Sequence, residues 1–170
     1  MKSLKNIKKC VMEIAQVLAT DEQIVKLLYN DQPDAIDKDV PKPIVDMNTL
    51  IQEHYICICA PVEDGIKDQW KNTFLTILLD NAFFGRADDN TAVNIKIYVS
   101  TDEQHLLLNG NKNRLFELLD CVITDLDGYK LSAAGKLEVG SFAHTMLSEF
   151  RFAYAISVSF NEQNARKVEI

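Results

Sequence analysis

Hydrophobic residues recur at helical spacing at the start of the chain. Between residues 4 and 18 they fall three and four positions apart, which predicts an amphipathic helix. Residues 21–29 repeat this spacing over a shorter length. Thr20, followed three positions later by Gln23, predicts a capping box at the start of the second helix. The chain is therefore expected to open with a pair of short helices.

A third helical stripe is the longest in the sequence. Hydrophobic residues continue at this spacing from Leu115 to Leu126, which predicts a helix over about 111–127. We expect the segment 109–111 to supply its N-cap and Gly128 to end it in the left-handed conformation.

Alternating hydrophobic and polar residues predict strands elsewhere. The apolar run 73–84 and the alternating run 93–99 flank turn-forming residues, which favours an antiparallel hairpin. Short strands are also expected at 55–60 and at 135–144, the latter with Leu137, Val139 and Ala143 on one side. The resulting class is α+β: an antiparallel sheet of about four to five strands, flanked by the helical pair and the long helix.

The final strand, 150–161, has two different faces. One face carries aromatic and branched residues and is expected in the core, whereas the other carries mostly Ala and Ser. Small side chains allow close approach, so we expect a helix of this chain or a neighbouring subunit to cover that face. A single domain over 1–170 is predicted, with a long acidic, proline-containing loop at 30–50 and a loose polar tail at 162–170.

Charge narrows the classes of partner. The net charge is −7, and the chain is acidic except for its first 19 residues, which contain four lysines and one glutamate. Nucleic-acid binding depends on many cations that neutralise phosphates, so specific nucleic-acid binding is not expected. Glu13 and Gln16 interrupt the apolar residues near the start, which argues against a signal peptide, and no run is long enough for a membrane helix. We expect a cytosolic setting with reduced thiols.

The chemistry-bearing residues do not form a recognisable catalytic or metal motif. His54, Cys57 and Cys59 are close in sequence, but alternation in a strand separates the histidine from the two thiols and no second ligand pair follows. Cys121 lies beside the long helical stripe without a local base. Phosphate-loop, dinucleotide-binding, nucleophile-elbow and zinc-protease motifs are absent. We therefore predict no enzyme activity, no cofactor and no metal.

The order of elements carries one resemblance. Residues 18–30, with Asp21, Ile24, Leu27, Leu28 and Tyr29 before an Asp- and Pro-containing loop, resemble the start of tail-terminator and tail-completion (neck) proteins of tailed bacteriophages. The hairpin, the long helix, the segment 135–142 and the closing strand are similar to the rest of that family. Residues 44–72 are longer than the family's usual connection.

The resemblance implies a structural virion protein that is assembled in the host cytoplasm. Such proteins close into a ring, often a hexamer, which ends the tail tube and contacts the head connector. A ring needs two complementary surfaces on each subunit. Candidate interface residues are the basic start of the chain, the aromatic and basic residues at the hairpin turn, and the acids beside them: Lys5, Lys8, Lys9, Phe83, Phe84, Arg86, Asp88 and Asp89.

Several alternatives stay open. Phe83 and Phe84 would be ordinary core residues if the hairpin turn were covered, and Asp88 and Asp89 would be ordinary turn residues. The protein would be a cytosolic adaptor or immunity-type binding protein if the acidic region 30–68 bound one basic partner. It would be a small enzyme if folding brought His105 or His144 beside Cys121.

Overall fold

The computed structural model describes residues 5–39, 46–58, 71–84 and 90–163. The helical elements are α1 (Lys5–Thr20), α2 (Glu22–Tyr29), η1 (Ala35–Asp37), α3 (Met47–Gln52), η3 (Glu103–His105), η4 (Asn109–Asn111) and α4 (Arg114–Leu126). The strands are β1 (Ile56–Ile58), β2 (Thr73–Phe84), β3 (Asn90–Asp102), β4 (Leu107–Leu108), β5 (Lys112–Asn113), β6 (Glu138–Ser148) and β7 (Arg151–Gln163).

Five strands form one sheet in the order β1-β2-β3-β7-β6. The predicted hairpin is confirmed, because β2 pairs antiparallel with β3, from Thr73 opposite Thr101 to Phe84 opposite Thr91. β7 pairs antiparallel with β3 and with β6. The α+β class is confirmed with one correction: β1 runs parallel to β2, so the sheet is mixed.

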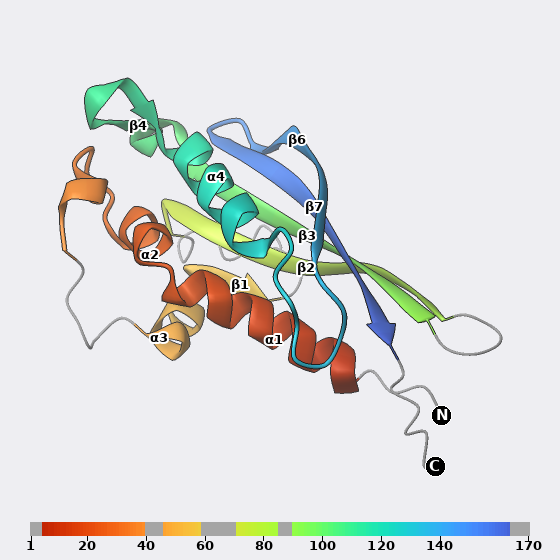
Figure 1. The fold of residues 1–170 in the computed structure, drawn as a ribbon. Coiled ribbons are helices and arrows are strands. Elements are labelled where there is room, and N and C mark those ends of the chain that lie inside the picture. The colour runs from red at the N-terminus through yellow and green to blue at the C-terminus, as the bar shows by residue number, and fades with distance from the viewer. Residues whose placement is uncertain (1–4, 40–45, 59–70, 85–89, 164–170) are drawn as a thin grey trace, which may run out of the picture.

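The helices pack on one face of this sheet (Figure 1). That face presents fully buried residues from the central strands, including Ile97 and Ile156, against Ile14 of α1, Leu28 of α2 and Leu118 of α4. The described helices leave the opposite, small-residue face of β7 uncovered. The helix of this chain that we expected there is therefore not among the described residues.

Two helix starts differ from the prediction. The Asp21 carboxylate, rather than the Thr20 hydroxyl, caps α2 by accepting from the backbone N–H of Ile24 at 2.7 Å. Thr20 is the last residue of α1, and its hydroxyl donates to the carbonyl of Val17. The cap of α4 is Asn113, not the segment 109–111, so the helix begins later than expected. Aspartate ranks above threonine as an N-cap, so propensity favours the residue that the structure uses.

Parts of the segments expected to be a loop (30–50) and a tail (162–170) belong to regular elements. Within 30–50, η1 and the beginning of α3 are ordered elements, and residues 40–45 lie outside the described part. β7 continues to Gln163, two residues into the predicted tail. Gly128 has a φ of 77°, as predicted for the residue that follows a helix end.

The edge strand β6 turns different side chains inward than its sequence predicts. Val139 lies opposite Val158, but a bulge then shifts the register so that Phe142 lies opposite Ile156. Phe142 therefore shares the helix-bearing face with Val139, whereas Ala143 points to the other face. The expected grouping of Val139 with Ala143 is wrong because an inserted residue reverses the alternation.

Arg114 ties three segments together at one end of the helical layer. It is fully buried, and its guanidinium donates to the carbonyl oxygens of His105 (2.8 Å), Leu27 (2.6 Å), Asn30 (2.7 Å) and Gln32 (2.9 Å). Two of these carbonyls lie at the C-terminal end of α2, where helix carbonyls lack partners within the helix. Burial lowers the pKa of Arg114, while the nearby carboxylates of Asp31 and Asp102 oppose that shift.

Candidate interaction surfaces

The predicted interface residues fall into three groups. Lys5, Lys8 and Lys9 are exposed on the first turns of α1. Phe83 is 65% exposed near the end of β2, where the hairpin projects beyond the helices, so it is not a core residue (Figure 1). The side chain of Phe84, together with Arg86, Asp88 and Asp89, lies outside the described residues.

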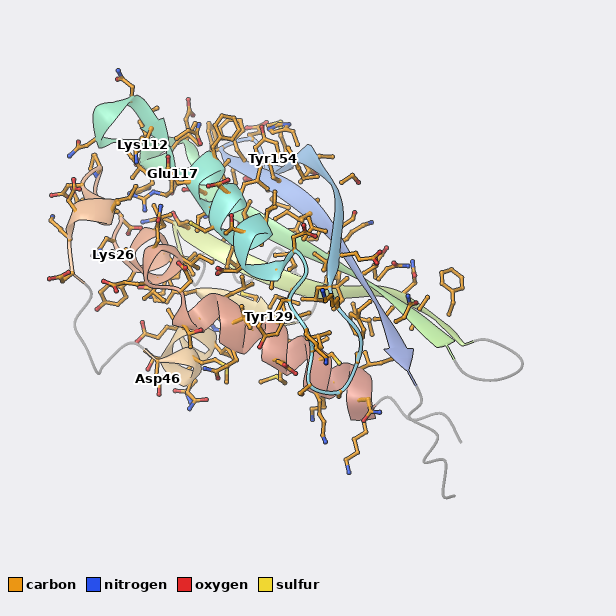
Figure 2. All side chains as sticks on the ribbon, in the orientation of Figure 1. Lys26, Asp46, Lys112, Glu117, Tyr129 and Tyr154 are labelled. Carbon is orange, nitrogen blue, oxygen red and sulfur yellow. The ribbon has the colours of Figure 1, made fainter. Side chains whose placement is uncertain are left out.

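A second basic segment lies beside the start of α1. The Glu13 carboxylate accepts from the Ser132 backbone N–H at 3.0 Å and from its hydroxyl at 2.6 Å, which holds the loop 129–137 against α1. Tyr129, labelled in Figure 2, lies at the start of this loop and packs against the core. Within the loop, Lys130 and Lys136 face each other across an isolated antiparallel bridge, and both are exposed. We call Lys5, Lys8, Lys9, Lys130 and Lys136 the basic end.

Like charges that face each other across a strand pair are unfavourable. Lys9 is four positions before Glu13 and so lies on the same side of α1. The loop contact thus brings the Lys130–Lys136 pair close to a helix surface that carries both Lys9 and Glu13. An anionic partner would relieve this repulsion.

Carboxylates gather around Cys121 on α4. Burial, followed by the charges of Asp21, Asp125, Asp120 and Glu117, raises the pKa of the Cys121 thiol to about 12. The Asp125 pKa is also raised, by burial and by Asp21, and its Oδ2 has no hydrogen-bond partner. We call these four carboxylates and Glu22, which is exposed in the first turn of α2, the acidic end.

The acidic end disfavours the thiolate form of Cys121. A reactive cysteine needs a lowered pKa, usually from a neighbouring cation. The surroundings of Cys121 have the opposite effect. His105 is held by Asp102 at the start of η3, and His144 is on β6.

Aromatic side chains cluster where α4 meets β6 and β7. The Tyr154 ring lies 5.7 Å from Phe116, 5.9 Å from Phe142 and 5.6 Å from His144, measured between ring centroids. His144 also lies 6.3 Å from Phe152. Rings are gathered around Tyr154 in Figure 2. We call these five residues the aromatic edge.

The aromatic edge is only partly buried. Phe116 and Phe142 are 55% and 52% exposed, and Met146 on the same face of β6 is 54% exposed. Exposed apolar groups that touch one another mark interaction surfaces more reliably than isolated ones. The sequence analysis missed this surface, although Phe142, His144 and Met146 alternate in the sequence. The bulge before Phe142 reverses the alternation of the strand, so the sequence pattern did not indicate which face of the sheet they share.

The small-residue face of the sheet holds a hollow of about 210 Å³. Its lining includes Asp80, Lys96, Gly140 and Ser157. The Asp80 carboxylate and the Lys96 ammonium are 3.5 Å apart. The two charges in this hollow are therefore already matched to each other.

Metal and membrane features are limited within the described part of the chain. Among those residues, no group of three or more His, Cys, Asp or Glu side chains is placed to hold a metal ion. Cys57 lies on β1, where burial raises its pKa, and Cys59 is outside the described residues. None of the described helices is both long enough and apolar enough to cross a membrane.

The sequence matches the YomW family over residues 21–161, from the cap of α2 to near the end of β7. This match includes the acidic end and the aromatic edge. No curated protein matches the sequence. Since the matched segment covers most of the chain, the protein belongs to the YomW family, a family of phage-associated proteins.

Proposed function

We propose that this protein is a structural component of a phage virion, and that it forms a ring that ends the tail tube and joins it to the head connector. Membership of a phage-associated family supports the viral setting. The order of elements, which resembles that of tail-terminator and neck proteins, supports the position in the virion. The proposed role is architectural and involves no catalytic step.

The observation that carries the ring is the pair of oppositely charged ends. The basic end begins at the first turn of α1, and Asp21 of the acidic end immediately follows the last turn of that helix. A helix of 16 residues is about 24 Å long, so α1 places Lys5 of the basic end about that far from Asp21 of the acidic end. Figure 1 shows the start of α1 and the beginning of α2 at opposite ends of the helical layer.

Two different, complementary surfaces on one subunit favour head-to-tail association. Such contacts are heterologous, and they close into a ring when the rotation between neighbours permits. Contact with an acidic end would offset the repulsion between Lys130 and Lys136. Opposite charge also directs the orientation of docking more than it adds affinity.

Charge reversal tests this arrangement. The variant K8E/K9E/K130E reverses the basic end, and E117K/D120K reverses the acidic end. We expect each variant to lose ring-sized species in sedimentation velocity, and a chain that carries all five changes to recover them. Lys38→Glu is the control, because it makes the same change at an exposed residue outside the basic end.

Assembly should also weaken between 50 and 300 mM salt, because exposed charges are screened within about 10 Å at 0.1 M. If each single-end variant assembles as well as wild type, the charged ends do not form the subunit contact. A monomer that binds one basic protein through an acidic surface would instead support the adaptor function.

A further inference from the structure

The strand β6 is an open edge of the sheet. It pairs with β7 on one side and, among the described strands, with nothing on the other. Its residues from Gly140 to His144 are all exposed. An open edge presents unpaired backbone groups that can join another strand.

This edge carries little protection against pairing. Proteins usually guard such edges with lysine, proline or inward-pointing charges. The strand begins with the exposed Glu138, but from Val139 to Ser148 it contains no proline and no Asp, Glu, Lys or Arg. Irregular pairing occurs at both ends, between Val139 and Phe142 and between Met146 and Ser148. A regular segment of five residues, Phe142–Met146, remains between them.

We propose that two copies of this chain pair through β6, antiparallel, about a two-fold axis at His144. The axis lies at His144 because that residue is the midpoint of the regular segment. Phe142 of one copy then faces Met146 of the other, and the reverse contact occurs across the axis. Both side chains are about half exposed in the single chain, and contacts between a thioether and an aromatic ring are favourable.

The same register keeps the helices of both copies on one side of the joined sheet. A two-fold axis perpendicular to the sheet leaves each face of the sheet on the same side in both copies. The two aromatic edges therefore meet and form one continuous apolar surface. On the other face, Ala143 lies opposite Thr145 of the second copy, and these small side chains allow close approach.

The occupant that this edge fits best is a second copy of this chain. Phe142 and Met146 lie two residues on either side of His144, and both are about half exposed. A two-fold axis at His144 therefore forms the same apolar contact twice. An unrelated strand would have to supply matching apolar residues at both positions.

The β6 pair uses a different surface from the charged ends and does not depend on the ring. An isologous contact of this kind forms a closed dimer. We infer that it occurs in the free protein. The two contacts can therefore be tested by separate substitutions.

Sedimentation velocity at 1–100 μM protein tests the pair in 300 mM salt, which weakens the contact between the charged ends. Wild type should show a concentration-dependent dimer under these conditions. His144→Lys places two like charges across the axis and should raise the dimer dissociation constant at least tenfold. Thr124→Lys is the matched control, since it adds the same charge at an exposed position of α4 away from the edge, and its dimer should persist. Far-ultraviolet circular dichroism checks that both variants fold.

A cross-link tests the register. His144→Cys should form an intermolecular disulfide with diamide, because directly opposed Cβ atoms lie about 4.5–5.5 Å apart. Wild type and Ser148→Cys, treated identically, should form little cross-linked product.

Three results overturn the proposal. One is wild type that remains monomeric at 100 μM. Another is a His144→Lys variant that dimerises as tightly as wild type, and the third is no His144→Cys cross-link. If rings form and respond to charge reversal at the two ends but not to His144→Lys, the proposed function stands and the β6 pair is wrong.

Discussion

Replacing Arg114 by methionine should lower the free energy of unfolding more than the same replacement of an exposed cation. Methionine fills much of the same volume but provides no donor. The carbonyls of Leu27, Asn30, Gln32 and His105 then lose the guanidinium that each accepts from. The α2 end and the loop before η1 would lose their connection to α4.

The magnitude follows from the burial of each bond. The bond to Leu27 is buried, and losing a partner there costs about 1–3 kcal/mol. The other three bonds are partly buried, so their carbonyls regain some hydration, and each lost bond costs about 0.5–1 kcal/mol of stability. The free energy of unfolding should therefore fall by about 2.5–6 kcal/mol.

Urea unfolding followed by circular dichroism measures this loss. The midpoint should fall while the slope with denaturant stays constant, because the surface exposed on unfolding changes little. Lys112→Met is the control: it removes an exposed cation two residues away and should cost less than about 1 kcal/mol. A loss below about 1 kcal/mol for Arg114→Met would refute the reasoning.

Three further predictions concern α4. Asn113→Ala should lower the free energy of unfolding by about 1 kcal/mol in urea titrations, because it removes the cap that accepts from the N–H groups of Leu115 and Phe116. Asp125→Asn should raise the free energy of unfolding at neutral pH. The raised pKa of Asp125 means that the folded state favours the protonated carboxyl. Asp125 therefore contributes stability at low pH, and that contribution is lost as pH rises through the raised pKa. The difference in melting temperature between the Asp125→Asn variant and wild type should therefore vanish below pH 3.8. Cys121 in the folded protein should react with iodoacetamide at pH 8 on the order of a thousandfold more slowly than in urea, because its pKa is about 12.

The sequence predicts the elements whose side chains alternate or repeat without interruption. The hairpin of β2 and β3 follows from the apolar run 73–84 and the alternation at 93–99, since no insertion occurs where the core forms. α4 follows from its stripe, and only its start is misplaced. Local signals were sufficient in these places because local and tertiary preferences agree.

Other features depend on contacts that a single sequence does not encode locally. The parallel pairing of β1 joins segments on either side of a long connection, and no periodicity reports its direction. The bonds of Arg114 go to backbone carbonyls, which leave no trace in side-chain patterns. The bulge before Phe142 reverses the facing of β6 and so concealed the aromatic edge.

The candidate interface was predicted only in part. Lys5, Lys8 and Lys9 are exposed as expected, but Lys130 and Lys136 join them through the contact between Glu13 and Ser132, which is distant in sequence. Exposure of Phe83 follows from the projection of the hairpin. That these residues form an interface between subunits stays a prediction.

The measurement that tests the ring most directly is native mass by light scattering across protein concentration, with negative-stain electron microscopy of the same fractions. A ring-forming subunit predicts particles of one uniform mass with a central opening, either in the free protein or after mixing with purified phage tail tubes. Strict monomers or closed dimers at every concentration, together with no ring at the ends of tail tubes, would contradict the proposed function.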